Sequence, residues 1–256
     1  MGILKALIFD CDGVLAETER DGHRVAFNSV FEENGISAIW DIEEYGELVN
    51  ISGGKERMKA YFNEHRNLNS TEQLSGVFIQ KLHKRKTEIF MEMGAKGKLP
   101  SRLGIKRIIK EAHDDGILLF VCSTSHEKSV SELIKSNLGE EYLNWFTELL
   151  CGDIVTNKKP APDIYNLVKE KYGLKGEECF VVEDTRNGLL AAKAAGMNCI
   201  VTPSFYSFNE DFTEADLVVS SLGEPRSSEI RIIKSNNKLS QNISCITIGD
   251  LKRLLE

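Results

Sequence analysis

Two aspartates separated by one residue, Asp10 and Asp12, stand at the end of a short apolar run and directly before Gly13. Such a run is typical of a strand buried on both faces of a parallel sheet. Because side chains alternate along a strand, the two carboxylates should point the same way beyond its end. Neighbouring carboxylates stay ionised together only when a cation lies between them, and hard oxygen ligands suit Mg²⁺. The spacing therefore predicts a magnesium site, at which Gly13 permits a sharp turn.

A solvated turn or a helix N-cap is the other interpretation of such an aspartate pair. The apolar strand before it favours a site, because ligands of open α/β sheets collect at the carboxyl ends of strands. A second predicted strand, 117–122, leads into Ser123, Thr124 and Ser125. Their hydroxyl and backbone N–H groups can either hold a phosphate oxygen or simply cap the next helix.

Two further segments supply charge after predicted strands. Lys158 and Lys159 precede two prolines, which stiffen the loop so that one lysine is presented with little freedom; a solvated lysine pair is the alternative. Glu183 and Asp184 follow the predicted strand 179–182. These acids either cap the next helix or complete a metal site.

Strands and helices alternate from Leu99 onward, as in a parallel, doubly wound sheet with right-handed crossovers. The predicted strands of this part are 117–122, 148–151, 179–182, 198–201 and 217–219. Its predicted helices are 104–114, 127–136, 163–172 and 187–195. Only helices are predicted before it, at 20–34, 41–49, 55–67 and 71–93, the last with Ser70-Thr71 as its N-cap.

The expected fold class is therefore α/β, with a doubly wound parallel-sheet core and an inserted all-helical cap domain. The core should comprise residues 1–15 and 99–256, and the cap residues 16–98. Near the C-terminal end, residues 230–233 and 243–248 flank a polar turn at 235–238 and predict a hairpin, which a helix to Leu255 follows.

Phe9-Asp10-Cys11-Asp12-Gly13-Val14 resembles the opening motif of the haloacid dehalogenase superfamily, and the other three segments resemble its remaining motifs in the same order. The resemblance covers essentially the whole core and implies a Rossmann-like phosphatase that works through an aspartyl-phosphate. By this resemblance Asp10 is the nucleophile and Asp12 the general acid and base. Ser123 with Thr124 binds the transferring phosphoryl group, and Lys159 neutralises its charge. The Mg²⁺ site is formed by Asp10, Asp12, Asp184 and Glu183.

The insert resembles the cap of CbbY-type sugar-bisphosphate phosphatases, in segments 16–19, 22–24, 26–28, 44–48 and 53–58. Plastid members of that family remove a phosphate from xylulose-1,5-bisphosphate, a by-product that inhibits Rubisco of the Calvin cycle. The resemblance thus implies a small phosphosugar substrate, Mg²⁺ as the cofactor and the chloroplast stroma as the location, with the cytoplasm as the alternative.

A bisphosphate also carries a phosphate that does not react. Lys55 and Arg57, which follow Gly53-Gly54, are the expected clamp for it, since glycines let backbone N–H groups approach and the basic pair adds charge. A solvated helix face is the alternative for these two residues. Glu17, His23 and Tyr45 are expected either to bond the sugar hydroxyls or only to pack within the cap.

Composition sets the remaining bounds. The 256 residues carry a net charge of −7, which argues against a general attraction to nucleic acid or to an anionic membrane. No apolar run approaches the roughly 20 residues that a membrane span needs. The six cysteines form no C-x-x-C pair and mostly lie in apolar runs, as expected of buried thiols in a reducing compartment. We expect a monomer that binds neither nucleic acid nor a membrane.

Other functions remain possible on the same core. A β-phosphoglucomutase-like phosphosugar mutase returns the phosphoryl group to sugar instead of water, and the core motifs do not distinguish it from a phosphatase. A phosphatase of another small phosphosugar is a second alternative. A non-enzymatic sugar-phosphate-binding module is a third, against which the intact Asp10 and Asp12 argue. A dinucleotide-binding oxidoreductase is excluded because no G-x-G-x-x-G follows a strand.

Overall fold

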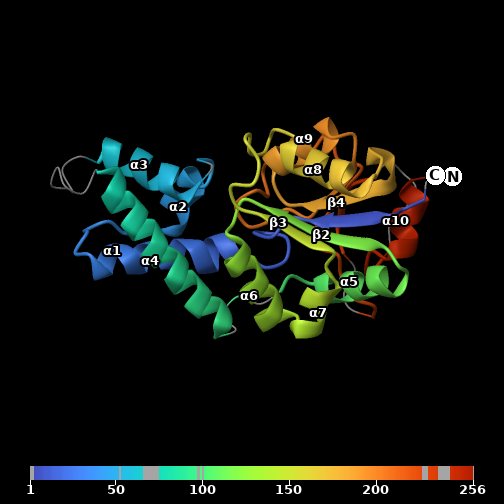
Figure 1. The fold of residues 1–256 in the computed structure, drawn as a ribbon, viewed down its shortest axis with the longest axis horizontal. Helices are drawn as coiled ribbons and strands as arrows, with labels where there is room; N and C mark the ends of the chain where they lie inside the picture. Colours follow the sequence, from blue (N-terminus) through green and yellow to red (C-terminus); the bar gives the residue numbers. More distant parts are fainter. Residues whose placement is uncertain are drawn as a thin grey trace. The chain divides into compact units, whose positions relative to one another are not determined.

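The computed structural model describes residues 3–51, 53–65, 75–96, 99, 101–226, 230–235 and 243–255. It divides into two compact units, one formed by residues 1–17 and 100–256 and the other by residues 18–99. The first is built on a sheet, and the second is helical (Figure 1). Residues 16 and 17, which we expected in the insert, fall in the first unit, where Ala16 forms backbone bridges with Asp12 and Ser101.

The described part of the first unit contains a seven-stranded sheet in the order β3-β2-β1-β4-β5-β6-β7. The strands are β1 (Ala6–Phe9), β2 (Leu118–Ser123), β3 (Glu148–Cys151), β4 (Cys179–Glu183), β5 (Asn198–Val201), β6 (Leu217–Val219) and β7 (Ile232–Ser235). All neighbouring pairs are parallel except β6 with β7. The predicted doubly wound core is thus confirmed, and its strand order changes direction between β1 and β4, where sheets of this kind bind ligands.

Helices cover both faces of this sheet. α8 (Asp163–Tyr172) and α9 (Arg186–Ala194) lie on one face, and α5 (Ile105–Asp114), α6 (Glu127–Asn137) and α7 (Glu140–Trp145) lie on the other (Figure 1). A 3₁₀ turn, η4 (Gly176–Glu178), leads into β4. Ile8 and Val181 from the strands pack with Leu189 and Tyr165 from the helices in one buried core. Burial on both sides explains why the strands are continuous apolar runs.

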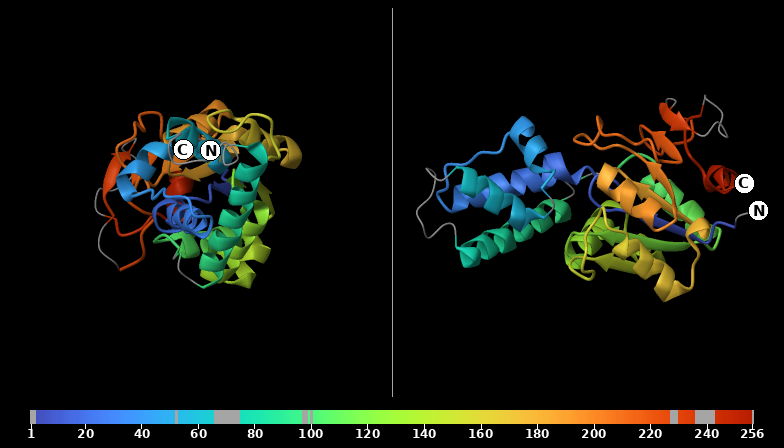
Figure 2. Two further views of the ribbon diagram at one scale, coloured as in Figure 1. Left: turned by 90° about the vertical axis from the view of Figure 1, so that its left-hand side faces the viewer. Right: turned by 90° about the horizontal axis from the view of Figure 1, so that it is seen from above.

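The second unit begins with a π-helical turn, η1 (Glu19–His23), that runs into α1 (Arg24–Glu33). α2 (Ile42–Leu48), α3 (Gly54–Glu64) and α4 (Gly76–Ala95) follow, and α1 lies beside α4 (Figure 2). Ser75 caps α4 through a hydrogen bond from Phe78 N, whereas the predicted cap at Ser70-Thr71 lies outside the described residues. Trp40 is fully buried at the centre, with its ring 4.7 Å from Phe27 and 4.9 Å from Phe31.

One hydrogen bond joins the two runs of the predicted C-terminal hairpin, from Ile230 N to Ile243 O at 3.0 Å. Strand β7 itself pairs antiparallel with β6, with Ile232 opposite Val219, a pairing that we did not expect in addition to the one with residues 243–248. The latter segment joins the loop after β6, where Ile246 N donates to Leu222 O at 2.9 Å. Strand β6 would otherwise leave a row of N–H and C=O groups unpaired at the sheet edge, and β7 satisfies them. Residues 236–238 of the expected turn lie outside the described residues.

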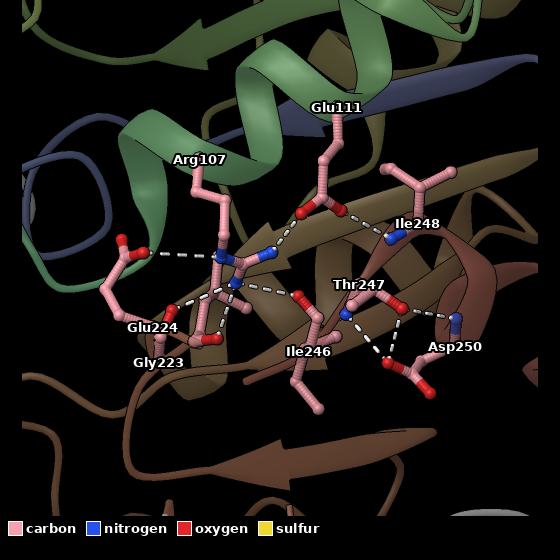
Figure 3. Close-up of polar contacts among 9 residues, drawn as sticks. Arg107, Glu111, Gly223, Glu224, Ile246, Thr247, Ile248 and Asp250 are labelled. Atoms are coloured by element: carbon pink, nitrogen blue, oxygen red, sulfur yellow. Dashed lines mark hydrogen bonds and ion pairs between the residues drawn. The ribbon is translucent and has the colours of Figure 1, made fainter. Parts of the chain in front are cut away.

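Arg107 on α5 attaches this C-terminal segment to the core (Figure 3). Its guanidinium donates at 2.9 to 3.0 Å to three main-chain oxygens, those of Leu222, Gly223 and Ile246. It also pairs at 2.7 Å with Glu111, whose other carboxylate oxygen accepts from Ile248 N at 3.1 Å. Ile248 begins the last helix, α10 (Ile248–Leu254), so one arginine and its partner hold both the loop and the helix start.

None of the described helices combines the length and apolarity that crossing a bilayer requires. All six cysteines are unpaired, and all are buried except Cys245, which is partly exposed.

Candidate active site

Asp10 directly follows β1, whose four residues are buried throughout. Asp10 N donates to Val182 O at 3.0 Å, so β1 stays paired with β4 up to this aspartate. Because Phe9 lies opposite Val182, the next residue of β4, Glu183, comes to lie beside Asp10, with Asp184 directly after it. The parallel register therefore brings the two predicted acidic segments together at the switch point of the sheet.

Lys159 is the positive charge at the centre of this group. Its Nζ lies 2.6 Å from Asp10 Oδ1 and 2.6 Å from Glu183 Oε1, and it donates to Cys122 O at 2.9 Å. Burial alone would lower the pKa of Lys159, but the two carboxylates outweigh burial and raise the pKa above its ordinary value. Lys159 is therefore a permanently charged group with a fixed position.

The acids themselves are poorly compensated. Burial is the main cause that raises the pKa of Asp10 to about 7; Lys159 opposes it, and the nearby Glu183 and Asp12 add to it. Burial also raises the pKa of Asp184 well above its usual range, with Glu183 and Asp10 contributing. One lysine does not neutralise several buried carboxylates, so the site has an excess of negative charge that a divalent cation would balance.

The residues present fit a metal ion. Among the described residues, Asp10, Glu183 and Asp184 each offer an oxygen within 4.8 Å of the others. Asp184 Oδ1 is buried and has no hydrogen-bond partner in the described part of the chain. A buried carboxylate oxygen without a partner is costly, and a cation in contact with it would remove that cost. Carboxylate oxygens are also the ligands that Mg²⁺ prefers.

Asp12 has a different environment from Asp10. Ser125 Oγ donates to Asp12 Oδ2 at 2.5 Å, so this carboxylate is held from the neighbouring strand end. Ser123, the last residue of β2, is buried, and its Oγ accepts from Ser125 N at 3.1 Å. Thr124 is exposed. The structure thus brings the serine segment to the second aspartate, and it identifies Ser125 as a contact that the sequence did not single out.

Two glycines allow the acids to pack closely. Gly13 has a φ of +80°, and a Cβ there would lie 2.1 Å from Asp184 Oδ2. A Cβ on Gly188, in the first turn of α9, would lie 1.9 Å from the carboxylate carbon of Glu183. Any side chain at either position would displace a carboxylate of the site, so both glycines are required for close approach.

Two positioning residues were absent from the prediction. The Tyr165 hydroxyl, on α8, donates to Glu183 Oε1 at 2.6 Å. The Arg102 guanidinium donates to the main-chain oxygens of Gly13, Thr202 and Pro203, next to the acids. The only signal in the sequence for Tyr165 was its place two residues after the predicted helix start at Asp163. Nothing in the sequence marked Arg102.

The helical unit pairs two of its predicted site residues with each other. Arg57 is buried, and its Nη1 donates to the Tyr45 hydroxyl at 2.5 Å. The same hydroxyl donates to Glu19 at 2.5 Å, and Arg57 reaches the main-chain oxygens of Val49 and Ile51 at 3.3 and 3.4 Å. Arg57 therefore has hydrogen-bond partners within this unit, which neither an open phosphate clamp nor a solvated helix face would require.

The other predicted cap residues lie in three places. His23 is buried, stacks on Phe90 with ring centres 4.0 Å apart, and has its Nδ1 2.7 Å from Lys86 Nζ. Gly53 has a φ of +93° and precedes α3, which Gly54 and Lys55 begin. Glu17 belongs to the first unit, where it accepts from Phe205 N at 3.3 Å.

Comparison with known proteins agrees with this geometry. A family model described as haloacid dehalogenase-like hydrolase matches residues 4–196. The CBBY-like protein of Arabidopsis thaliana is 48% identical over 223 residues, which are 86% of this chain and 70% of that protein. Two crystal structures of CbbY from Rhodobacter sphaeroides, one with phosphate and one of a mutant with xylulose-(1,5)bisphosphate, each match with a TM-score of 0.78 at 40% identity, over 86% of this chain and 95% of theirs. The chain therefore belongs to the haloacid dehalogenase-like hydrolases, and within that family it is a CbbY-type phosphatase.

Proposed function

We propose that this enzyme is a Mg²⁺-dependent phosphatase that removes a phosphate from xylulose-1,5-bisphosphate through an aspartyl-phosphate on Asp10. The observation that carries the proposal is the 2.6 Å pairing of Lys159 with Asp10 inside a cluster of buried acids. The sugar-bisphosphate substrate is supported by the similarity to the CbbY mutant crystallised with xylulose-(1,5)bisphosphate.

In this proposal Asp10 Oδ attacks the phosphorus atom and forms an acyl-phosphate bond, while the bond from phosphorus to the sugar oxygen breaks. Asp12 gives its proton to the leaving sugar oxygen and then takes one from water, which attacks the aspartyl-phosphate and releases inorganic phosphate. Ser125 donates to Asp12 Oδ2 and so holds this carboxyl group in position. Lys159 balances the charge of the substrate dianion.

Asp10, Glu183 and Asp184 would hold the Mg²⁺, and we retain Asp12 as a further ligand. When bound, the ion supplies positive charge that offsets the phosphate dianion beside the nucleophile. Most of the roughly 20 kcal/mol of barrier lowering that a phosphate monoester needs then comes from positioning and charge balance.

We further propose that the helical unit selects the substrate. Lys55, at the first turn of α3 behind Gly53-Gly54, would bind the non-reacting phosphate. Because Arg57 is engaged by Tyr45 and by two main-chain oxygens, its contribution would be to hold the α3 start. Glu17, His23 and Tyr45 remain our candidates for contacts with the sugar hydroxyls.

Release of inorganic phosphate from a panel of sugar mono- and bisphosphates, with Mg²⁺, tests the proposal. We expect kcat/KM for xylulose-1,5-bisphosphate to exceed that for ribulose-1,5-bisphosphate and xylulose 5-phosphate by about a hundredfold or more. Similar values across the panel would contradict the substrate. Conversion of glucose 1-phosphate to glucose 6-phosphate without phosphate release, followed by phosphorus NMR, would instead establish the mutase.

The nucleophile is tested separately with Asp10→Asn, which is nearly isosteric and removes only the attacking charge. We expect turnover to disappear while the circular dichroism spectrum is unchanged. Residual turnover within about tenfold of the wild type would exclude Asp10 as the nucleophile. Asp115→Asn is the matched control, because Asp115 pairs with Lys252 at the surface.

The plastid setting is likewise a proposal, drawn from the resemblance of the sequence. Imaging of the full-length gene product fused to a fluorescent protein in living cells tests it, and a cytoplasmic signal would contradict it.

A further inference from the structure

Arg102 lies where the chain returns to the first unit, before α5. Its guanidinium contacts two separate loops. Nη1 donates to Gly13 O, in the turn after the catalytic aspartates, and at 2.6 Å to Thr202 O, after β5. Nη2 donates to Pro203 O at 2.9 Å. The Arg102 backbone N–H also donates to Leu15 O at 3.0 Å, so the residue is tied to the first loop twice.

These two loops meet on the Asp184 carboxylate. From one side Gly13 packs so closely that a Cβ there would lie 2.1 Å from Asp184 Oδ2. From the other side lies the buried Ser204, the residue after Pro203: its Cβ is 3.1 Å from the place that a Cβ on Gly13 would take, and its hydroxyl acts to lower the pKa of the Asp184 carboxyl. Ser204 is fixed in turn by Ser207, whose Oγ accepts from Ser204 N at 2.9 Å. Asp184 Oδ1 is the oxygen left without a partner among the described residues.

We infer that Arg102 is a positioning residue that fixes the Asp184 carboxylate for the cation by clamping the Gly13 turn and the 202–204 loop around it. The inference rests on the proposed function, because it takes Asp184 to be a ligand of Mg²⁺. It adds a residue that acts on Asp184 through the loops it holds, by main-chain oxygens and by the Thr202 hydroxyl at 3.3 Å.

The shape of the guanidinium matters more than its charge. A planar fork reaches oxygens of two loops at once, whereas an ammonium is a compact point charge on a flexible stem. Burial lowers the pKa of Arg102, with Asp184 and Glu17 opposing it, so the side chain is a partly desolvated cation held by fixed dipoles. Arg102→Lys would keep the charge and lose the simultaneous hold on Gly13 and Pro203.

The experiment is a calorimetric titration of the substrate-free protein with MgCl₂, together with steady-state kinetics at saturating Mg²⁺. For Arg102→Lys we expect the Mg²⁺ Kd to rise by about tenfold or more, as for groups that orient metal ligands, while KM for the bisphosphate at saturating Mg²⁺ changes little. Arg107→Lys is the matched control, since Arg107 likewise holds three main-chain oxygens but on the C-terminal segment (Figure 3). It should lower Tm and leave the Mg²⁺ Kd unchanged.

Ser204→Ala tests the same link one step nearer the carboxylate and keeps the inference falsifiable if Arg102→Lys fails to fold. We expect it to weaken Mg²⁺ binding in the same direction. A Kd within about twofold of the wild type for either folded variant, with only Tm reduced, would overturn the inference and leave the proposed phosphatase intact. Absence of Mg²⁺ binding by the wild type would overturn both.

Discussion

Glu183 Oε1 accepts two hydrogen bonds at 2.6 Å, one from the Tyr165 hydroxyl and one from Lys159 Nζ. Tyr165 is fully buried on α8, and its ring also lies 5.1 Å from Lys159 Nζ. The helix therefore contacts both members of the ion pair and holds the lysine between Glu183 and Asp10.

Tyr165→Phe should consequently destabilise the protein without removing catalysis. A hydrogen bond to a buried charged group is worth about 1.5–3 kcal/mol, so we expect a fall of that size in the free energy of unfolding. The pairing of Lys159 with Asp10 remains, so kcat should fall by less than about tenfold. Chemical denaturation and steady-state kinetics measure the two effects. Tyr172→Phe is the control, because Tyr172 donates to the less buried Glu148 from the same helix.

Removal of divalent cations should abolish activity, and added Mg²⁺ should restore it. Asp10, Glu183 and Asp184 crowd negative charge that Lys159 alone does not balance. Asp184→Asn should raise the Mg²⁺ concentration for half-maximal activity by about tenfold or more. Undiminished turnover after exhaustive chelation with EDTA would show that the cluster works without a metal.

The helical unit should lose stability on mild acidification because of His83 on α4. The pKa of His83 is lowered to about 4, chiefly by burial and in addition by Lys86, Lys55 and His23, against an opposite effect of Glu56. The unfolded chain takes up this proton near its ordinary pKa of about 6.5. The contribution of neutral His83 is therefore fully present above pH 6.5 and is lost as the pH falls toward 4.

The slope of stability against pH is at most about 1.4 kcal/mol per unit, and His83 is only partly buried, so solvent screening reduces it. Urea unfolding followed by Trp40 fluorescence measures this slope. The experiment uses a Trp145→Phe background, so that Trp40 is the only tryptophan and the signal does not include Trp145, whose ring stacks 4.5 Å from His113. His83→Gln should flatten the profile between pH 6.5 and 4. An unchanged slope in that variant would assign the acid sensitivity to another group.

Lys55 and Arg57, which the sequence suggested as one clamp for the non-reacting phosphate, should differ in the effect of their mutation. Lys55→Ala should reduce kcat/KM for a bisphosphate by about ten- to hundredfold and leave a matched monophosphate nearly unchanged. Arg57→Ala removes the donor to the Tyr45 hydroxyl and should lower Tm and affect both substrates alike. A bisphosphate-selective loss for Arg57→Ala with unchanged Tm would restore the original clamp.

The sequence predicted that the candidate site residues gather at one edge of the sheet. Asp10 and Asp184 could be placed because parallel strands end at one edge, and the apolar runs before them identified the strands. Lys159 lies in the loop between β3 and α8, and the two prolines after it were its signal. Ser125 and Tyr165 could not be singled out, because which hydroxyl turns toward a carboxylate depends on side-chain direction across the sheet. Arg102 was missed for the same reason, since its partners are main-chain oxygens far away in sequence.

Two features of the fold were also beyond local patterns. Helix α7 has only six residues and a glycine, Gly139, as its N-cap without a side-chain hydrogen bond, so no start signal marks it. The pairing of β7 with β6 was not expected, because a polar turn between two apolar runs does not reveal that β6 needs a partner at the sheet edge.

The attachment through Arg107 has a consequence for how this chain can diverge. Arg107 recognises only backbone oxygens at Leu222, Gly223 and Ile246, so the side chains at Leu222 and Ile246 are restricted by packing alone. Gly223 is different, because its φ is +66° and a Cβ there would lie 2.0 Å from Ser244 O. Relatives of this sequence should therefore vary along the C-terminal segment within the limits of packing while keeping Arg107 and Gly223, and these two positions can identify distant members with the same segment.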